Sequence, residues 1–205
     1  MSAISPPLLG PRFSQALGWA AELHRDQTRK GTTVPYVSHL LAVTALVLEH
    51  GADEDEAIAA LLHDAVEDQG GASTLAEIRR RFGDRVAGIV AAVSDTDMVP
   101  KPPWRERKEG YLHHLADATT TTSALLVSAA DKLHNARSIL TDLTADGDQI
   151  WTRFNAGPDE QLWYYHSLVD ILSSRLPGEL TDELARVVAE LERAITASPS
   201  ASPTG

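Results

Sequence analysis

Apolar side chains recur along this chain at spacings of three and four residues, the period of one face of an α-helix. In the first half of the chain, no segment shows the alternation of apolar and polar residues that is typical of a half-buried strand. Glycines and prolines interrupt the helical pattern at intervals. Helices are therefore predicted over residues 12–27, 37–50, 55–68, 74–82, 84–93, 105–115, 124–140, 159–175 and 179–196.

Local signals mark where several of these helices begin and end. Gly51 suits the position that follows a helix. Thr74 and Glu77 have the spacing of a capping box, which predicts the start of the helix that runs to residue 82. Three prolines between residues 95 and 104 predict a loop. The segment 124–140 begins with an apolar run that could form a buried strand, but its length favours a helix.

The chain is expected to form a single all-α domain. Its 205 residues suffice for one domain with a sizeable core, and no shift in composition divides them. We predict a flexible N-terminal segment over residues 1–11, the domain over 12–197, and a disordered tail over 198–205. The chain has neither a signal-peptide pattern nor a long uninterrupted apolar run. A cytoplasmic protein without a membrane partner is therefore expected.

Charge and cysteine content narrow the kinds of ligand. The net charge of -11 argues against a broad nucleic-acid-binding surface, which needs clustered Lys and Arg. It leaves room for a small phosphorylated ligand in a locally basic pocket. The absence of cysteine excludes disulfides, zinc thiolate sites and cysteine nucleophiles. Oxygen and imidazole groups remain as candidate metal ligands.

The segment HDAVED, residues 63–68, places four ionisable groups directly after the apolar run 57–62. On a regular helix they would occupy less than half of the circumference, at about 0°, 100°, 40° and 140° for His63, Asp64, Glu67 and Asp68. Carboxylates in an apolar core must be paired or bound to a cation. A metal site is the simplest interpretation.

A second polar stripe interrupts the apolar segment 124–140. Asp131, Asn135 and Ser138 would lie at about 0°, 40° and -20° on a helix. If the two stripes meet, they supply imidazole and carboxylate ligands together with an amide and a hydroxyl for a substrate. His39 is a further imidazole candidate. Such a mixed site suits manganese, iron or zinc better than magnesium, which prefers oxygen ligands.

Basic residues precede His39 in a turn-rich segment. Arg29, Lys30 and the flexible Gly31 form the kind of loop that binds phosphate beside a metal, which suits an anionic substrate. Other polar and aromatic residues have less specific interpretations. We expect His24 to be a core histidine, and surface or packing positions for His50, His113, His114, His134 and His166. A core and interface stripe is favoured over a base-stacking platform, and a role at the pocket rim is left open, for Trp151, Phe154, Trp163, Tyr164 and Tyr165.

Three ordered motifs resemble those of a known family. They are Arg29-Lys30-Gly31 with Pro35-Tyr36 and His39, then His63-Asp64 with Glu67-Asp68, then Asp131-Lys132-Leu133-His134-Asn135. In this order they resemble the HD-type hydrolase domain of the RelA/SpoT proteins, in particular the stand-alone small alarmone hydrolases. The motifs lie between residues 12 and 140, and the last third of the chain is similar only as additional helices.

The resemblance implies a single-domain HD-type helical bundle that removes the 3′-diphosphate of (p)ppGpp, giving GDP or GTP and pyrophosphate, usually with Mn²⁺. It implies metal ligands at His39, His63, Asp64 and Asp131. It further implies a pair that positions and activates water at Glu67 and Asp68. The implied substrate contacts are Arg29, Lys30, Tyr36, Asn135 and Ser138, with Tyr36 near the base. A synthetase or regulatory domain is not expected.

This sequence departs from the family pattern at two positions next to these motifs. Leu40 replaces a common proline and Gln69 a common threonine, and both changes could reshape the pocket. Alternatives to a guanosine alarmone are an adenosine alarmone such as ppApp, or the 2′-phosphate of NADPH, because the motifs specify metal and phosphate but not the base. A non-catalytic metal and nucleotide sensor and an HD phosphohydrolase for 5′-phosphates are further alternatives. The oligomeric state is left open.

Overall fold

Every regular element in the described part of the chain is a helix, which confirms the all-α prediction. This computed structural model describes residues 9–95 and 102–197. In these ranges, β-type pairing is limited to an isolated antiparallel bridge between Thr28 and Pro35. The elements are α1 (Pro11–Leu23), α2 (Val37–Glu49), α3 (Glu54–Leu62), α4 (Ala65–Asp68), α5 (Gly71–Phe82), α6 (Asp84–Val93), α7 (Trp104–Ala116), α8 (Thr122–Asp146), the 3₁₀ helix η1 (Gly147–Arg153), α9 (Pro158–Arg175) and α10 (Glu179–Ala197).

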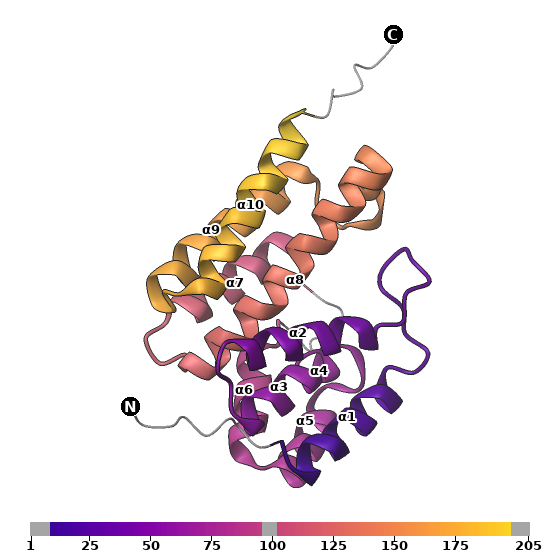
Figure 1. The fold of residues 1–205 in the computed structure, drawn as a ribbon, viewed down its shortest axis with the longest axis vertical. Coiled ribbons are helices and arrows are strands. Elements are labelled where there is room, and N and C mark those ends of the chain that lie inside the picture. Colours follow the sequence, from indigo (N-terminus) through magenta and orange to yellow (C-terminus); the bar gives the residue numbers. More distant parts are fainter. Residues whose placement is uncertain (1–8, 96–101, 198–205) are drawn as a thin grey trace.

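The long helix α8 connects the two ends of the molecule. It contains 25 residues, which corresponds to about 37 Å at 1.5 Å per residue. Figure 1 shows α1 to α6 grouped at one end and α9 with α10 at the other. Helix α8 packs against α2 and α6 in the first group and against α9 and α10 in the second. An ion pair between Arg137 and Glu183 adds to the contact between α8 and α10.

Helix α3 carries the chain into the interior. Residues 57–62 have no exposed surface, and α3 packs against α1, α2, α6 and α8. His63 follows directly and is 3% exposed. His39 on α2 and Asp131 on α8 are also buried. The residues predicted to bind metal therefore meet where α2, α3 and α8 pack together.

The first predicted helix ends four residues early. Helix α1 stops at Leu23, and His24 is its C-terminal cap. The reason lies in tertiary hydrogen bonds of Gln27, whose side-chain oxygen accepts from Gln69 while its amide group donates to Asp68. Those contacts hold Gln27 in the loop, although its spacing fits the apolar face of the helix.

The helix predicted over residues 55–68 is two helices in the structure. Helix α3 ends at Leu62, and His63 and Asp64 form a turn before the short α4. The prediction of one continuous stripe for HDAVED is therefore wrong. Both residues keep right-handed backbone angles in this turn, and Nε2 of His63 lies 2.9 Å from Oδ2 of Asp64.

The capping box predicted at Thr74 is also wrong. Helix α5 begins three residues earlier, at Gly71, and the Thr74 hydroxyl donates to the carbonyl oxygen of Gln69 at 2.7 Å. Gly70 and Gly71 have φ of 127° and 60°, and such values allow a tight turn that other residues rarely adopt. A complete capping box occurs elsewhere, at the start of α3, where Asp53 and Glu56 bond each other's backbone.

The remaining boundaries agree with the predictions to within a few residues, except that α8 continues to Asp146 and η1 was not predicted. The expected tail over 198–205, most of the N-terminal segment 1–11 and residues 96–101 of the expected loop lie outside the described residues. Within the described ranges, no helix has the length and apolar character needed to cross a membrane.

Candidate active site

Four side chains with metal-binding groups meet at the junction of α2, α3 and α8. Nε2 of His39 lies 3.3 Å from Nε2 of His63 and 3.2 Å from Oδ1 of Asp131. Oδ2 of Asp64 lies 2.9 Å from Nε2 of His63 and 3.5 Å from Nε2 of His39. The structure thus brings together all four side chains predicted as metal ligands.

The separations of the His39, His63 and Asp131 atoms, and those of Asp64 from the two histidines, suit a single divalent cation. Ligand atoms about 2.1 Å from an ion lie about 3.0 Å apart at right angles and about 3.4 Å apart in a tetrahedron. Five of the six distances among the four atoms run from 2.9 to 3.6 Å, and the ligand atoms of His39, His63 and Asp131 all lie within 4.8 Å of one another. Two imidazoles and two carboxylates form the mixed donor set that borderline divalent metals prefer.

Hydrogen bonds to the other ring nitrogens fix the orientation of both histidines. Nδ1 of His63 donates to the carbonyl oxygen of Ala60 at 2.8 Å. Nδ1 of His39 lies 2.8 Å from Nδ1 of His134. Burial and the neighbouring His39 and Arg29 lower the pKa of His134 to about 4, so its ring is neutral and can accept this bond. Both Nε2 atoms are thereby directed at the cluster.

The position of His134 corrects the expectation that it is a surface or packing residue. It is only half-buried, but its ring bonds a candidate metal ligand. A signal for this contact exists in the sequence, because His134 follows Asp131 by three residues and borders the polar stripe of α8 at about -60°.

The cluster is electrostatically suited to a cation. Burial opposes the charged form of Asp64, but the imidazoles of His63 and His39 hold the pKa of this carboxyl well below its usual range. The pKa of Asp131 is also held well below its usual range, against burial, by Lys132 and the two imidazoles. Burial opposes protonation of His63, yet Asp64 and Asp131 raise its pKa well above the usual value. A metal ion would replace the proton that His63 holds in its absence.

Tyr36 orients Asp64. Its hydroxyl donates to Oδ2 of Asp64 at 2.5 Å, and burial together with the Asp64 charge raises the pKa of the phenol, which keeps it a donor. The ring stacks on His24, with centroids 5.3 Å apart, and contacts His39 edge-on. Tyr36 was predicted to lie near a base, and it also lines the cavity described below.

The acidic pair Glu67 and Asp68 points toward two different neighbours. Glu67 accepts from the backbone N–H of Asp95 at 2.5 Å. Burial and the charge of Asp64 raise the pKa of Glu67, although the Asp95 N–H opposes the shift. The Asp95 carboxylate in turn binds Arg107 at 2.5 Å and Lys108 at 2.7 Å. Glu67 is therefore held between the cluster and the start of α7.

Asp68 is exposed and faces the basic loop. Its Oδ2 accepts from the side-chain amide of Gln27 at 2.7 Å. The oxygen of that amide is 2.7 Å from both Nδ1 of His24 and the amide nitrogen of Gln69. These two contacts fix the direction of the amide, so its NH₂ group must face Asp68. His24 is buried, as predicted.

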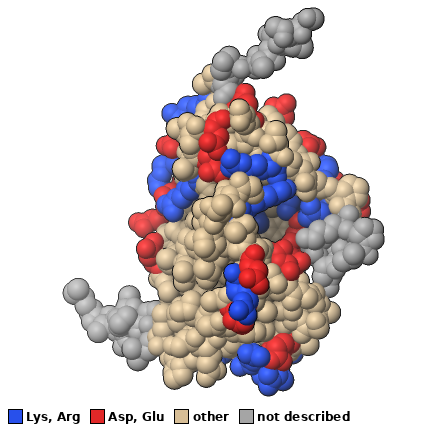
Figure 2. Space-filling model, turned by 90° about the vertical axis from the view of Figure 1, so that its right-hand side faces the viewer, with Lys and Arg blue, Asp and Glu red and all other residues tan. Residues whose placement is uncertain are grey.

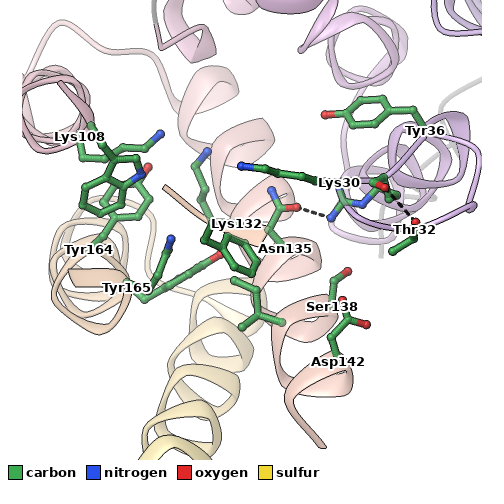
Figure 3. Close-up of a pocket in the computed structure, with 15 residues that line it drawn as sticks. Lys30, Thr32, Tyr36, Lys108, Lys132, Asn135, Ser138, Asp142, Tyr164 and Tyr165 are labelled. Atoms are coloured by element: carbon green, nitrogen blue, oxygen red, sulfur yellow. Dashed lines mark hydrogen bonds between the residues drawn. The ribbon is translucent and has the colours of Figure 1, made fainter. Parts of the chain in front are cut away.

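A cavity of about 320 Å³ opens beside the cluster between the loop of residues 25–35, α8 and α9. Among the described residues, four cationic side chains line it, namely Arg29, Lys30, Lys108 and Lys132. Figure 3 shows Lys30 and Lys132 reaching into it from opposite walls. Figure 2 shows Lys and Arg side chains gathered beside a hollow on this side of the molecule. The acidic protein therefore contains a locally basic pocket.

Lys108 and Lys132 were missed by the sequence prediction. Burial and the nearby Lys132 charge lower the pKa of Lys108. Lys132 lies 2.6 Å from Oδ2 of Asp131, and this ion pair overcomes burial and raises its pKa well above the usual range. Two ammonium groups that repel each other at one cavity favour an anion between them. Lys132 lies within the DKLHN motif, whereas Lys108 gives no signal in the sequence.

Predicted substrate contacts on α8 connect the cavity with the cluster. Arg29 donates to Oδ1 of Asn135 at 2.7 Å, and Asn135 donates to Oδ1 of Asp131 at 2.6 Å. Ser138 lines the cavity and donates to the carbonyl oxygen of His134 at 3.0 Å. Lys30 lies 3.4 Å from Oδ1 of Asn155. All the predicted substrate contacts therefore line one cavity.

The basic loop is held in place by η1. Gly31 has φ +73°, and a Cβ atom at this position would lie 2.6 Å from Cδ of Arg153. Arg153 is itself fixed by ion pairs with Asp142 at 3.1 Å and Asp146 at 2.6 Å. The close contact between this arginine and the Gly31 backbone therefore requires glycine.

The aromatic residues expected to form a core stripe have two functions. Tyr164 and Tyr165 are 4% exposed, as a core position requires, and they also line the cavity. Phe154 and Trp104 line it as well. The hydroxyl of Tyr164 is buried without a hydrogen-bond partner among the described residues. The aromatic stripe is therefore part of the core and part of the pocket wall.

Comparisons with known proteins agree with this geometry. The HD domain family matches residues 16–161. The chain is 39% identical over 128 residues to guanosine-3′,5′-bis(diphosphate) 3′-pyrophosphohydrolase MESH1 of Xenopus tropicalis. The aligned region covers 61% of this chain and 68% of that protein. It is 34% identical over 145 residues to the protein of the same name from Drosophila melanogaster, with coverages of 69% and 75%.

Among solved structures, one of a metazoan ortholog of SpoT that hydrolyses ppGpp superimposes with a TM-score of 0.71. The sequence identity is 28%, and the match covers 88% of this chain and 96% of the other. The family model, the two relatives and the solved structure therefore each match more than half of this chain. The chain belongs to the HD domain family and, within it, to the guanosine-3′,5′-bis(diphosphate) 3′-pyrophosphohydrolases.

Proposed function

We propose that this protein is a metal-dependent phosphohydrolase that removes the 3′-diphosphate of (p)ppGpp and releases GDP or GTP with pyrophosphate. The observation that carries this proposal is the adjacency of two features. A four-ligand cluster contacts Tyr36, Lys132 and Asn135, which line a cavity with four cationic side chains among its described residues. One feature suits a metal ion, and the other suits a substrate with several phosphates.

The proposed metal ligands are His39, His63, Asp64 and Asp131, with Mn²⁺ as the proposed ion. A divalent ion bound there would lower the pKa of a water molecule and neutralise phosphate charge. Tyr36 and His134 would keep Asp64 and His39 in their orientations, since each bonds its partner directly. The ligand set supports manganese, iron or zinc on chemical grounds.

The protein's own residues would bind the phosphates and accept a proton. Arg29, Lys30 and the two lysines of α7 and α8 would bind phosphate oxygens. Glu67 is the proposed proton acceptor, because burial raises its pKa toward neutrality and a base is most effective near the operating pH. Asp68, oriented by Gln27, would position the attacking water.

The reaction forms a bond from the water oxygen to the phosphorus on the ribose 3′ oxygen. The bond between that phosphorus and the 3′ oxygen breaks, and pyrophosphate leaves with both phosphorus atoms. One proton passes from water to the protein and one is returned to the 3′ oxygen. We propose that this takes place in the cytoplasm, a reducing compartment that agrees with a chain without cysteine.

A product-resolved hydrolysis panel tests the proposal. ppGpp, ppApp, NADPH and deoxynucleoside triphosphates are each incubated with Mn²⁺, Mg²⁺ or Zn²⁺, and the products are separated by ion exchange. We expect pyrophosphate and GDP from ppGpp with Mn²⁺. The proposal would be overturned if NADPH were the only substrate to release phosphate, or if neither alarmone released pyrophosphate.

The roles of Glu67 and Asp68 are tested by the double variant Glu67→Gln with Asp68→Asn. We expect kcat to fall by about 10²- to 10⁴-fold, the usual contribution of a general base. The control is Asp170→Asn with Glu190→Gln, which neutralises two exposed carboxylates on α9 and α10 and should leave kcat unchanged. Unchanged turnover in the first variant would contradict the mechanism.

A further inference from the structure

We propose that Asp142 selects the base of the substrate by accepting hydrogen bonds from N1–H and N2–H of guanine. This inference rests on the proposed function, because it assumes that the phosphates of a nucleotide occupy the basic part of the cavity. It assigns the base, which the metal and phosphate motifs leave open. Asp142 lies outside these motifs, but it lines the same cavity.

The position of Asp142 extends the polar stripe of α8. It follows Asp131 by eleven residues, which places it at about 20° on the helix, between Asn135 and Ser138 in angle. At 1.5 Å per residue, it lies about 16 Å along the helix from Asp131 and about 10 Å from Asn135. Figure 3 shows Asn135, Ser138 and Asp142 along the same side of α8. The cavity therefore runs from Lys132 and Asn135, which both contact Asp131, to this carboxylate.

Charge determines which part of a nucleotide can lie against Asp142. Among the described residues that line the cavity, Asp142 is the one with a carboxylate, and four others are cationic. A carboxylate repels phosphate but is a strong acceptor for neutral N–H donors. The phosphates should therefore bind near the lysines and the metal ligands. The base is the part of the molecule that is left for Asp142.

The hydrogen-bonding edges of the two purines make this contact selective. Guanine presents the neighbouring donors N1–H and N2–H, and a carboxylate can accept from both. Adenine presents one donor, at N6, beside the acceptor N1, and the lone pair of N1 would face the carboxylate oxygen. A site that hydrogen-bonds one substrate rejects an analogue which leaves its polar groups unpaired. Asp142 should therefore favour guanine.

Arg153 holds the carboxylate in this place. Its guanidinium group lies 3.1 Å from Oδ2 of Asp142 and 2.6 Å from Oδ2 of Asp146, and its stem packs on Gly31. Asp142 is thus tied to the same loop that presents Arg29 and Lys30. The guanidinium also offsets the negative charge that Asp142 brings to a cavity for a polyanion.

The test compares ppGpp and ppApp as substrates of the wild type and of Asp142→Asn with Mn²⁺. The wild type should prefer ppGpp by at least about 10-fold in kcat/KM. In the variant, kcat/KM for ppGpp should fall by about 10- to 100-fold, while ppApp changes by less than about threefold, because an amide can pair with adenine. The control Asp146→Asn removes the other partner of Arg153, outside the cavity, and should retain the wild-type preference.

The outcomes separate this inference from the proposed function. Equal loss on both substrates, or no change in preference, overturns the role of Asp142 while hydrolysis of ppGpp still supports the function. If the wild type releases no pyrophosphate from either, the proposed function fails. Titration calorimetry with GDP and ADP then tests the inference. The role of Asp142 requires that Asp142→Asn binds GDP more weakly than the wild type does and binds ADP equally well. Equal binding of both by the wild type overturns it.

Discussion

At the scale of single residues, each candidate metal ligand is oriented by a neighbour of different chemistry. A phenol bonds Asp64, a neutral imidazole bonds His39, and a backbone carbonyl bonds His63. Such outer contacts limit rotation of the ligands and set which ring nitrogen faces the metal. They also make the site sensitive to substitutions at residues that do not touch the ion.

His134 provides a test at this scale. His134→Leu removes the partner of Nδ1 of His39 while roughly preserving volume, so the His39 ring loses its fixed orientation. We expect Mn²⁺ affinity to fall by about 10- to 100-fold, the usual effect of removing such a partner. Competition against a chelating dye measures this. His166→Gln, at an exposed position on α9, is the control, and equal losses in both variants would contradict the assignment.

At the scale of elements, the cluster and cavity depend on two breaks in the helical pattern. His63 and Asp64 lie in the turn between α3 and α4, where both contact Nε2 of His39. Helix α1 ends at Leu23, and the loop of residues 25–35 that follows places Arg29 and Lys30 beside α8. Both breaks are stabilised by contacts with distant parts of the chain.

The packing of this loop on η1 can be tested at Gly31. Gly31→Ala requires a left-handed backbone and places Cβ 2.6 Å from Arg153, so we expect a loss of at least about 1 kcal/mol in stability and a raised KM. Gly88→Ala is the matched control, because Gly88 lies inside α6 with nothing within 4 Å of the added atom. It should stabilise by up to about 1 kcal/mol. Urea denaturation measures both, and equal effects would refute the contact.

The capping box of α3 supports the helix that delivers His63. Asp53→Ala removes the acceptor for the backbone N–H of Glu56, and we expect a loss of about 0.5–2 kcal/mol in the free energy of unfolding. Glu77→Gln is the comparison, because Glu77 bonds exposed arginines on α5 and caps no helix start. It should change stability by less than about 0.5 kcal/mol. A larger loss of stability in Glu77→Gln than in Asp53→Ala would contradict the assignment of the capping box to Asp53.

At the scale of the whole molecule, a metal ion would connect α2, α3 and α8 at one point. Ligand binding to the folded state at about 100 times Kd adds about 2.7 kcal/mol, which is a rise in Tm of roughly 5–10 °C for a chain of this size. Removal of the ion with a chelator should reverse the rise. Differential scanning fluorimetry with and without Mn²⁺ measures it.

The metal-induced rise in Tm should be larger at pH 8 than at pH 6. Without metal, the folded state holds a proton on His63, whose pKa is raised above that of the unfolded chain. This proton contributes stability below the unfolded pKa of about 6.5, and the contribution is lost as the pH rises through the folded pKa. The metal must displace the proton, so acid opposes binding. A larger rise at pH 6 would contradict the proposed role of His63.

Much of this protein could be predicted from local patterns. Helical periodicity identified the helices, because burial of an apolar stripe leaves a regular trace in the sequence. The ionisable groups placed in apolar segments indicated candidate metal ligands, since such groups are unfavourable in a core without a partner. The arginine and lysine of the loop were found because they stand beside a candidate ligand.

Tertiary structure decided the features that depend on distant partners. The turn inside HDAVED, the early end of α1 and the start of α5 follow from contacts and glycine geometry that periodicity does not record. Lys108 lies outside the three motifs and reaches the cavity because α7 packs against α9. Asp142 extends a visible stripe, but only the cavity shows that it faces a ligand site. Periodicity shows which side of a helix is buried, whereas a functional site depends on which residues of other elements face that side.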